Sequence, residues 1–271
     1  MSTPSDANGG SNHRYWNEVG RQVGNRLPRL DPFLGELKRD AYLKLVERWA
    51  PGLTCGTILK TDLFEEAFGT DSLVPGLAAE ADVVVGFDIS DRITRIADSK
   101  TEPGNREFIV SDARKLPFDD RSFDLIVSPS TLDHFQDHRD LGVSLKELAR
   151  VLKPSGRLII SLDNRQNIGD PLLRAVNRLG WLPFYLGKSY TVTELQQELQ
   201  AAGFHVRETT AILHNPRLFA VAGIAIARKL NWKVLEGLVE RLLRTTQGLE
   251  HTRLRYFTGS FVAAVATRRE Q

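Results

Sequence analysis

The chain alternates short apolar runs with stretches of helical periodicity over most of its length. The runs stay largely apolar instead of alternating with polar residues, which is typical of strands buried on both faces of a sheet. Helical crossovers between such strands produce parallel pairing. We therefore predict an α/β fold with a doubly wound, mostly parallel sheet. The predicted strands are residues 57–59, 83–87, 107–110, 123–127, 157–162 and 206–213.

Helical segments are predicted on both sides of this region. Apolar residues recur at helical spacing from Asp31 to Ala50, which predicts one or two amphipathic helices before the sheet. A basic helical pair is predicted over residues 216–246, and its second helix carries an apolar stripe. One last strand-like run extends from Gly259 to Thr267. The apolar stripe consists of Leu235, Leu238, Val239 and Leu242.

These patterns divide the chain into five parts. The first residues are small and polar, so we expect a disordered start, followed by a helical cap, a Rossmann-like core, a helical insertion and the last strand of the core. The corresponding ranges are residues 1–14, 15–52, 53–215, 216–250 and 251–271.

The amino-acid composition restricts the class of protein and the cellular location that we expect. With 41% apolar and 26% charged residues in 271, the chain is an ordinary globular one. Its single cysteine, Cys55, can form neither an internal disulfide nor a cysteine metal site. The longest apolar run, residues 218–227, is about half of a bilayer span, and the first residues lack the apolar core of a secretory signal. We therefore expect a cytoplasmic protein without a transmembrane segment.

Charge is distributed unevenly. The net charge of +2 is too small to indicate a nucleic-acid binder. From Pro216 onward, however, ten Lys and Arg stand against four Asp and Glu, a net charge of +6, and the preceding residues carry −4. The basic helical pair is either a solvated face or a surface that rests on an anionic membrane or admits a lipid-like substrate.

Three polar positions follow directly after predicted strands. Ligands of an open parallel sheet bind beyond the carboxyl ends of its strands. Asp88, followed by Ile89, ends VVVGFD and is placed to accept the hydroxyls of a ribose. Asp112 follows FIVS and can accept from an exocyclic amine, and Ser128 opens SPSTLDHF. Any one of them could be a helix cap or a turn residue, but their order indicates a nucleotide site.

The segment from Val83 to Asn164 resembles the class I S-adenosylmethionine-dependent methyltransferases, in particular the type 11 branch. The resemblance runs through GFDIS, SDARKLPFDDRSFDLIVSPSTLDHF and LKELARVLKPSGRLIISLDN, and the later YTVTELQQELQAAGFHV resembles the helix and strand that follow in that family. It implies a seven-stranded sheet and S-adenosylmethionine as cofactor. By this resemblance Asp88 with Ile89 would bind the ribose, Asp112 with Ala113 the adenine, and Ser128 would lie beside the methionine moiety.

The chain departs from that family at its first motif. There the family has a strand that ends in an acidic residue and a loop with three alternating glycines, which lets the backbone approach the cofactor. This chain reads TILKTDLFEEAFG, so Lys60 replaces the carboxylate. The glycines are replaced by Asp62, Phe64 and Glu66.

Two interpretations of this loop remain open. In the first, the Lys60-Thr61-Asp62 edge binds the cofactor. Asp62 binds the ammonium of the cofactor's methionine moiety, Lys60 binds the carboxylate of that moiety, and Gly69 supplies a permissive turn. In the second, the pocket is closed and the fold is a non-catalytic binding module or partner subunit. The two charges of opposite sign at one strand end favour the first interpretation.

A general base is needed only if the acceptor arrives protonated. His134, in LDHF, is the candidate, and Asp133 is placed to orient or replace it. The alternative is that His134 only packs at the sheet edge. His138 follows at i+4 with Asp137 and Asp140 nearby, a spacing that can bind metal, but QDHRD is typical of a solvated turn and we expect no metal.

We expect the acceptor to be a small, partly apolar molecule, and we expect the methyl group to be transferred to an oxygen atom of it. Aromatic residues near the cap could line its pocket or simply belong to the core. Arg253 and Arg255 could pair with an anionic group of the acceptor. A nucleic-acid substrate is disfavoured because the base-clamping motif that follows the fourth strand in such enzymes is replaced by SPSTLDHF. The aromatic candidates are Trp16, Phe33, Trp181, Phe184, Tyr185 and Phe219.

Overall fold

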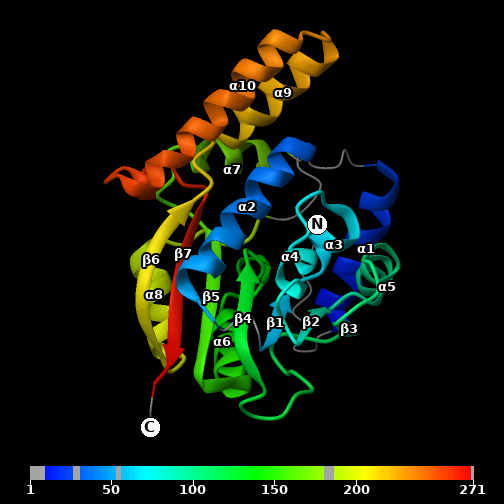
Figure 1. Cartoon of the computed structure of the whole chain (residues 1–271), viewed down its shortest axis with the longest axis vertical. Helices are drawn as coiled ribbons and strands as arrows, with labels where there is room; N and C mark the ends of the chain where they lie inside the picture. The colour runs from blue at the N-terminus through cyan, green and yellow to red at the C-terminus, as the bar shows by residue number, and fades with distance from the viewer. Residues whose placement is uncertain (1–9, 27–30, 53–55, 180–185, 270–271) are drawn as a thin grey trace.

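A seven-stranded sheet forms the centre of the molecule (Figure 1). The computed structural model describes residues 10–26, 31–52, 56–179 and 186–269. The strand order is β3-β2-β1-β4-β5-β7-β6. In this described sheet, β7 is the one strand that runs opposite to the other six. The predicted doubly wound, mostly parallel sheet is therefore confirmed. The strands are β1 (Thr57–Thr61), β2 (Val83–Asp88), β3 (Arg106–Val110), β4 (Phe123–Pro129), β5 (Leu152–Asp163), β6 (Phe204–Ile212) and β7 (Phe261–Arg268).

Helices cover both faces of the sheet. The longer α-helices are α1 (Gly10–Arg26), α2 (Pro32–Trp49), α5 (Asp91–Lys100), α6 (Arg139–Val151), α7 (Asp170–Arg178), α8 (Val192–Ala201), α9 (Arg217–Lys229) and α10 (Lys233–Thr246). The shorter helices are α3 (Phe64–Phe68), α4 (Val74–Ala78), η1 (Leu132–His134), η2 (Gln247–His251) and α11 (Arg255–Thr258).

The core lies in two layers because successive strand residues point to opposite faces. Ile58 of β1 packs in the layer with α2 and α4, whereas Leu59 packs in the layer with α6 and α8. Both side chains are fully buried. This is why the strands read as apolar runs in the sequence. A third, smaller cluster joins α3 to α5, and α1 packs against α5.

Local signals account for several helix ends. The Ser90 side chain accepts a hydrogen bond from Ile93 N, as expected for the cap of α5. Thr191 and Glu194 form a capping box at the start of α8. The Asp31 side chain caps α2, which is a single helix and not two.

The N-terminal region differs from expectation. Residues 1–14 were expected to be disordered, but α1 already begins at Gly10. Few of its residues are apolar, so periodicity gave no signal. Val23 packs against the cluster that contains Ile93 of α5, and polar contacts with α5 complete the attachment. Asn17 accepts from Ser90 Oγ at 2.5 Å and donates to Asp91 Oδ1 at 2.8 Å.

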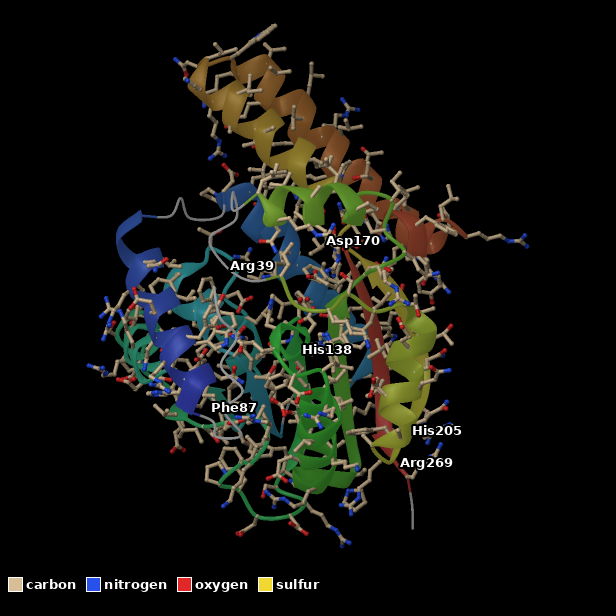
Figure 2. The ribbon with its side chains drawn as sticks, turned by 180° about the vertical axis from the view of Figure 1, so that it is seen from behind. Arg39, Phe87, His138, Asp170, His205 and Arg269 are labelled. Carbon is tan, nitrogen blue, oxygen red and sulfur yellow. The ribbon has the colours of Figure 1, made fainter. Side chains whose placement is uncertain are left out.

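The basic helical pair forms the α9–α10 hairpin, within the predicted range. Figure 1 shows it projecting from the end of the sheet at which the parallel strands finish. From the opposite side, Figure 2 shows Asp170, the first residue of α7, beneath the hairpin. Within the described ranges, every helix is too short or too polar to cross a membrane.

Candidate functional site

A small cavity lies where β1, β2, β3 and β4 end. Its volume is about 70 Å³, and α1 closes it from outside. The predicted site residues that line it come from four strand ends and from η1, so the structure brings most of the predicted nucleotide site together. These residues are Asp62, Asp88, Ile89, Asp112, Ala113 and His134.

Asp62 follows β1 directly and has a left-handed backbone, with φ of 67°. Glycine is favoured in this region and Asp is one of the few other residues that adopt it readily. The sequence comparison places Asp62 where the first glycine of the family's loop is expected. The turn is therefore kept, and a carboxyl group is added to it. Asp62 Oδ1 accepts from Phe64 N at 2.7 Å, which fixes this side chain.

Asp88 ends β2 and is buried at its carboxyl end. Its two oxygens accept from Ser90 N at 2.7 Å and from Leu63 N at 3.2 Å. Burial raises the pKa of Asp88 to about 6 against the effect of these hydrogen bonds. Burial therefore removes water from the Asp88 carboxyl group, and the two backbone hydrogen bonds fix its orientation.

Asp62 and Asp88 form an acidic pair. Burial, together with the charges of Glu65 and Asp88, raises the pKa of Asp62 well above its ordinary value. The two side chains share a hydrogen bond, which lowers the pKa of Asp88. The ionised form of Asp62 is therefore disfavoured, and the two carboxyl groups are placed to share a proton. A cavity with such a pair suits a ligand that brings hydrogen-bond donors or a positive charge.

Asp112 lies in the loop after β3 beside Ala113, and both contribute to the cavity wall. Arg114 holds the Asp112 carboxylate through Nε at 3.0 Å and reaches Asp140 on α6 at 2.9 Å. This clamp fixes Asp112 at the rim of the cavity. Arg114 donates to this carboxylate from its backbone N, Nε and Nη2, so about one of the carboxylate's roughly four acceptor positions is left for a further donor.

His134 and Trp16 close the cavity on the side of α1. Their rings meet edge to face with centroids 5.9 Å apart. Trp16, which was expected near the acceptor, thus lies against the predicted base and over the nucleotide site. The cavity is smaller than the roughly 300 Å³ of a typical ligand pocket, and α1 narrows it with Asn12 and Trp16.

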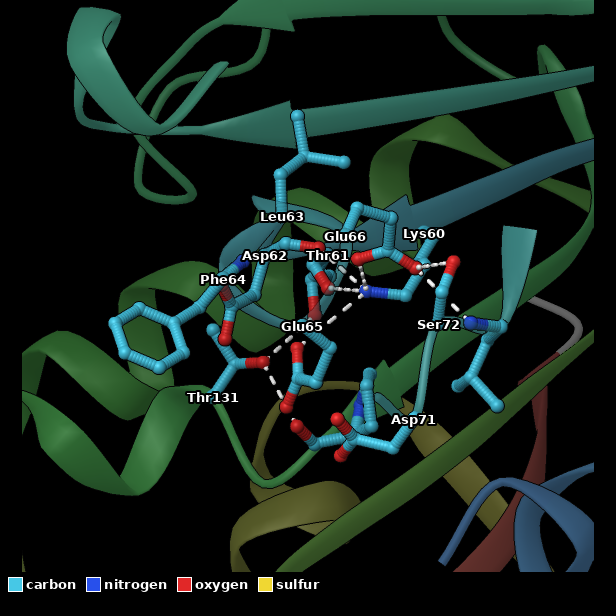
Figure 3. Close-up of polar contacts among 12 residues, drawn as sticks. Lys60, Thr61, Asp62, Leu63, Phe64, Glu65, Glu66, Asp71, Ser72 and Thr131 are labelled. Atoms are coloured by element: carbon cyan, nitrogen blue, oxygen red, sulfur yellow. Dashed lines mark hydrogen bonds and ion pairs between the residues drawn. The ribbon is translucent and has the colours of Figure 1, made fainter. Parts of the chain in front are cut away.

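Lys60 has partners other than the expected ligand (Figure 3). It is fully buried, and its Nζ lies 2.9 Å from Glu66 Oε2 and 2.6 Å from the carbonyl oxygen of Asp62. Burial alone would lower the pKa of Lys60, but Glu66 and Glu65 raise it, so the ammonium stays charged. Its charge is used inside the protein, and Lys60 is not among the described residues that line the cavity.

The network around Lys60 extends to α2. Lys38 Nζ lies 2.9 Å from Glu65 and 2.6 Å from Asp71. Although burial would raise the pKa of Glu65, Lys38 and Lys60 lower it to about 2. Glu66 also accepts from Leu73 N at 3.0 Å, near the start of α4. The charged loop is therefore an internally paired network that holds α2, α3 and α4 together.

The bulky residues of this loop turn away from the cavity. Phe64 packs against Phe68, with ring centroids 5.2 Å apart, in the cluster between α3 and α5. Glu66 points into the Lys60 network. Gly69 has a φ of −81°, so the permissive turn expected of it is not needed. Its lack of a side chain matters for packing instead, because a Cβ there would overlap Asp71 Oδ1.

A chain of hydroxyl groups links β1 to β4 behind the cavity. Thr61 Oγ1 donates to Ser128 Oγ at 2.9 Å and lies 3.2 Å from Thr131 Oγ1. Thr61 and Ser128 are buried, and Thr131 is the member of this chain that reaches the cavity wall.

A second cavity, of about 380 Å³, opens beside the first at the end of β5. Its floor contains Asp163, Asn164 and His214, and its walls come from α7, η2 and α11. Burial lowers the pKa of His214, which is hydrogen-bonded to Ala211 O at 2.9 Å and to Thr258 Oγ1 at 2.8 Å. His214 is thus a neutral structural residue. The apolar lining residues are Ile168, Leu172, Leu173, Leu249 and Phe257.

Asp133 lies between the two cavities. Its Oδ2 accepts from Asp163 N at 2.6 Å and from Ser130 Oγ at 3.2 Å. Its Oδ1 is buried and has no hydrogen-bond partner among the described residues. Burial raises its pKa. The neighbouring chain is packed tightly here, since a Cβ at Gly187 would overlap the carbonyl oxygen of Asp133.

The other aromatic candidates are distributed differently. Phe33 belongs to the core between α2 and the sheet. Trp181, Phe184 and Tyr185 lie outside the described residues, as does the side chain of Phe219.

The suspected metal spacing separates in the structure. His134 lines the first cavity, whereas His138 is exposed. In the described part of the chain, no group of three or more His, Cys, Asp or Glu residues is arranged to hold a metal ion.

Sequence reasoning did not identify Asn17, Lys38 or Thr131. Asn17 and Lys38 reach the site from helices that are distant in sequence, and no local pattern marks them. Thr131 could have been found, because it lies three residues after Ser128 in SPSTLDHF.

The chain is similar in sequence to known methyltransferases. A family model for a methyltransferase domain matches residues 65–160. The O-methyltransferase cnsE of Penicillium expansum is 28% identical over 242 residues, which cover 82% of this chain and 76% of the relative. The ubiquinone biosynthesis O-methyltransferase of Rhodopseudomonas palustris (strain HaA2) is 26% identical over 219 residues, covering 75% and 80% of the two chains.

The fold is also found in solved structures. The magnesium protoporphyrin IX methyltransferase of Synechocystis PCC 6803, solved with bound SAH, superposes with a TM-score of 0.61. The match covers 96% of this chain and 100% of that chain at 16% sequence identity, so it concerns the fold.

Proposed function

Because the chain belongs to the class I S-adenosylmethionine-dependent methyltransferases, we propose that it methylates an oxygen atom of a small, partly apolar molecule. The observation that carries this proposal is the meeting of Asp62, Asp88 and Asp112 in one cavity at the ends of β1, β2 and β3.

The three carboxyl groups fit the cofactor chemically. S-adenosylmethionine offers hydrogen-bond donors at its ammonium, its ribose and its adenine amine. Asp62 would hold the ammonium, Asp88 with Ile89 the ribose, and Asp112 with Ala113 the adenine. Lys60 already neutralises Glu66, so it would support the loop and not contact the cofactor. This assignment retains the carboxylate of the Lys-Thr-Asp edge and changes the role of the lysine.

His134 and Asp133 would handle the proton of the acceptor. When bound, the cofactor supplies an electrophilic methyl group, and orientation of the acceptor can then provide much of the rate. His134 would accept the acceptor's proton from the side of the first cavity. Asp133, with a raised pKa and an unpartnered oxygen, would orient His134 or take the proton itself.

The second cavity would hold the acceptor. It is separated from the first by Asp133, its lining is largely apolar, and its volume suits a small molecule. Both relatives described above are named as O-methyltransferases, which supports oxygen as the acceptor atom.

Calorimetry with S-adenosylhomocysteine, the demethylated cofactor, tests this site. We expect micromolar binding to the unmodified chain. Asp88→Asn and Asp112→Asn should each weaken it by about 1 to 3 kcal/mol, because each leaves ligand donors without an ionised acceptor. Asp119→Asn, at an exposed carboxylate outside the cavity, is the matched control. Absence of binding by the folded wild-type chain would favour the non-catalytic alternative.

A further inference from the structure

The α9–α10 hairpin exposes a row of large apolar side chains. Val234, Leu238 and Leu242 of α10 are 69%, 61% and 63% exposed. Their spacing of four residues aligns them along one side of the helix. A helix in a globular protein normally turns such a row toward the core. On α10 the row that packs inward is a different one, which includes Leu243 and Val239.

Helix α9 adds to the same side of the hairpin. The helices are antiparallel and meet where Gly223 faces Val239. Some residues of each helix point toward the other helix. Because the two helices run in opposite directions, the residues that directly precede these inward-facing residues lie on the same side of the hairpin in both helices. That rule places Ile226, before buried Ala227, beside Leu238. We call the exposed set the apolar ridge: Ile226, Leu230, Trp232, Val234, Leu238 and Leu242, all more than half exposed.

The opposite side of the hairpin is attached to the body. Arg228 lies 2.5 Å from Asp31, and Arg244 lies 3.0 Å from Glu36, both at α2. Each arginine comes directly after an inward-facing residue, so both point to the side away from the ridge. The ion pairs therefore hold the hairpin against α2 with the ridge turned outward.

Cations border the ridge. Lys233 and Arg241 each precede a ridge residue of α10, and Lys229 lies beside Leu230. Within the described residues, no ion pair is recorded for Lys229 or Arg241. The segment 217–246 contains six Lys and Arg against two Asp and Glu. An exposed apolar row flanked by Lys and Arg is typical of helices that lie in the interface of an anionic membrane.

The ridge leads toward the second cavity. The line of Leu242 continues through Thr246 into η2, and Thr246 and Leu249 both belong to the cavity wall. Around the mouth, Ile168, Leu172 and Phe257 are about half exposed or more. Beyond Thr246, the exposed apolar side chains of the hairpin are therefore followed by those around the mouth of the cavity.

We propose that the apolar ridge docks on an anionic lipid surface and brings the mouth of the second cavity against it. A second copy of the chain fits this surface less well, because a two-fold symmetric contact would place the Lys233 and Arg241 rows of both copies together. That the cavity then receives an acceptor from the lipid rests on the proposed function, whereas the docking itself does not.

Flotation of the full chain with lipid vesicles tests the docking. We expect binding to phosphatidylcholine vesicles that contain phosphatidylglycerol, little binding to phosphatidylcholine alone, and weakening by salt. The variant Val234→Ser/Leu238→Ser/Leu242→Ser should lose at least about tenfold in affinity, at about 0.8 kcal/mol per buried CH₂. Lys229→Gln/Arg241→Gln should lose binding selectively on the anionic vesicles. Val143→Ser and Lys146→Gln, exposed on α6, are the matched controls and should bind normally.

Two further substitutions test whether the mouth of the second cavity faces the lipid. Leu172→Ser and Phe257→Ser should each reduce vesicle binding several-fold if the mouth faces the lipid. Unchanged binding by both would overturn that part of the proposal.

Two results would overturn the docking itself. One is the absence of anionic-vesicle binding by a wild-type chain that is monomeric and folded by circular dichroism. The other is a wild-type dimer in light scattering that the ridge variant converts to monomers, which would identify a second copy as the occupant. Binding of S-adenosylhomocysteine, measured on the same samples, should be unchanged in the ridge variant. Its loss in the wild type would contradict the proposed function and leave the docking intact.

Discussion

Asp62 and Asp88 are two buried carboxyl groups that share a hydrogen bond in the first cavity. An ammonium group placed against Asp62 would stabilise its ionised form and lower its raised pKa. Binding of S-adenosylhomocysteine should therefore release protons.

The binding enthalpy reports this release. Calorimetry in phosphate and in Tris should give enthalpies that differ by the ionisation enthalpies of the buffers. In Asp62→Asn the difference should disappear, while Asp119→Asn should behave as the wild type. A wild-type enthalpy that does not depend on the buffer would remove Asp62 from the ammonium site.

Lys60 is the central cation of the buried network. Lys60→Met would leave Glu66 without its partner at 2.9 Å, and loss of one member of a buried ion pair costs about 3 to 5 kcal/mol. Urea unfolding should show this loss in the free energy of unfolding. Lys146→Met, on the surface of α6, should change it by no more than about 0.5 kcal/mol. A loss below about 1 kcal/mol in Lys60→Met would show that the network contributes little to the fold.

Residue identities allowed part of the site to be predicted. Asp88, Asp112 and His134 could be located because each comes directly after an apolar strand or its loop, and strand ends meet at one edge of the sheet. Lys60 illustrates what sequence cannot show. Its charge indicated a ligand, but Glu66, six residues later on α3, neutralises it. Only the path of the loop determines which partner is reached.

Helix α1 contributes Asn12 and Trp16 to the wall of the first cavity, so we expect its position to limit access to that cavity. Its main polar anchor is Asn17, which contacts Ser90 and Asp91 at the start of α5. Asn17→Ala removes these hydrogen bonds and should loosen α1. We expect faster amide hydrogen exchange in α1 and a faster association rate for S-adenosylhomocysteine in stopped-flow measurements.

A matched change separates this effect from general loosening of the helix. Gln22→Ala lies on the exposed side of α1 and contacts only Glu18 of the same helix among the described residues. It should leave the association rate unchanged. If Asn17→Ala speeds exchange but not association, α1 is not the barrier to entry.

Elements with strong periodicity were predictable, and elements held by long-range polar contacts were not. Helix α2 carries regularly spaced apolar residues that enter the core, and the α9–α10 hairpin has a clear apolar stripe. Helix α1 has neither feature, since its attachment comes from side chains more than seventy residues away. The stripe of the hairpin also misled in part, because Leu238 and Leu242 are exposed whereas Leu243, next to them, is buried.

The stability of the whole molecule should depend on pH through Asp88. Its pKa is about 6 in the folded protein and about 3.9 in an unfolded chain. Between these values the folded state binds more protons, so the free energy of unfolding falls as pH rises through this window. From pH 4 to pH 7 this group alone should cost about 2 kcal/mol.

Comparison with Asp88→Asn isolates this contribution. The variant lacks the titration, so its stability relative to the wild type should improve by about 2 kcal/mol between pH 4 and pH 7 in urea unfolding. Asp119→Asn should show the same difference from the wild type at both values. A constant difference for Asp88→Asn would mean that its pKa is not raised.

At the scale of the fold, the sequence was a good guide because the central strands are buried on both faces. Buried parallel strands leave continuous apolar runs, and their alternation with helices restricts the topology to few arrangements. The position of the last strand between β5 and β6 was not visible in the pattern, and the family resemblance was used only to expect a seven-stranded sheet.

The place of β7 in the sheet also determines the order in which the chain can assemble. Within the described sheet, β6 is hydrogen-bonded to β7 alone, and β7 separates it from β5. On the ribosome, β5 and β6 would wait with open edges until residues 261–268 emerge from the exit tunnel. A premature stop before Phe261 would thus deprive two strands of partners at once and leave a product suited to aggregation or proteolysis.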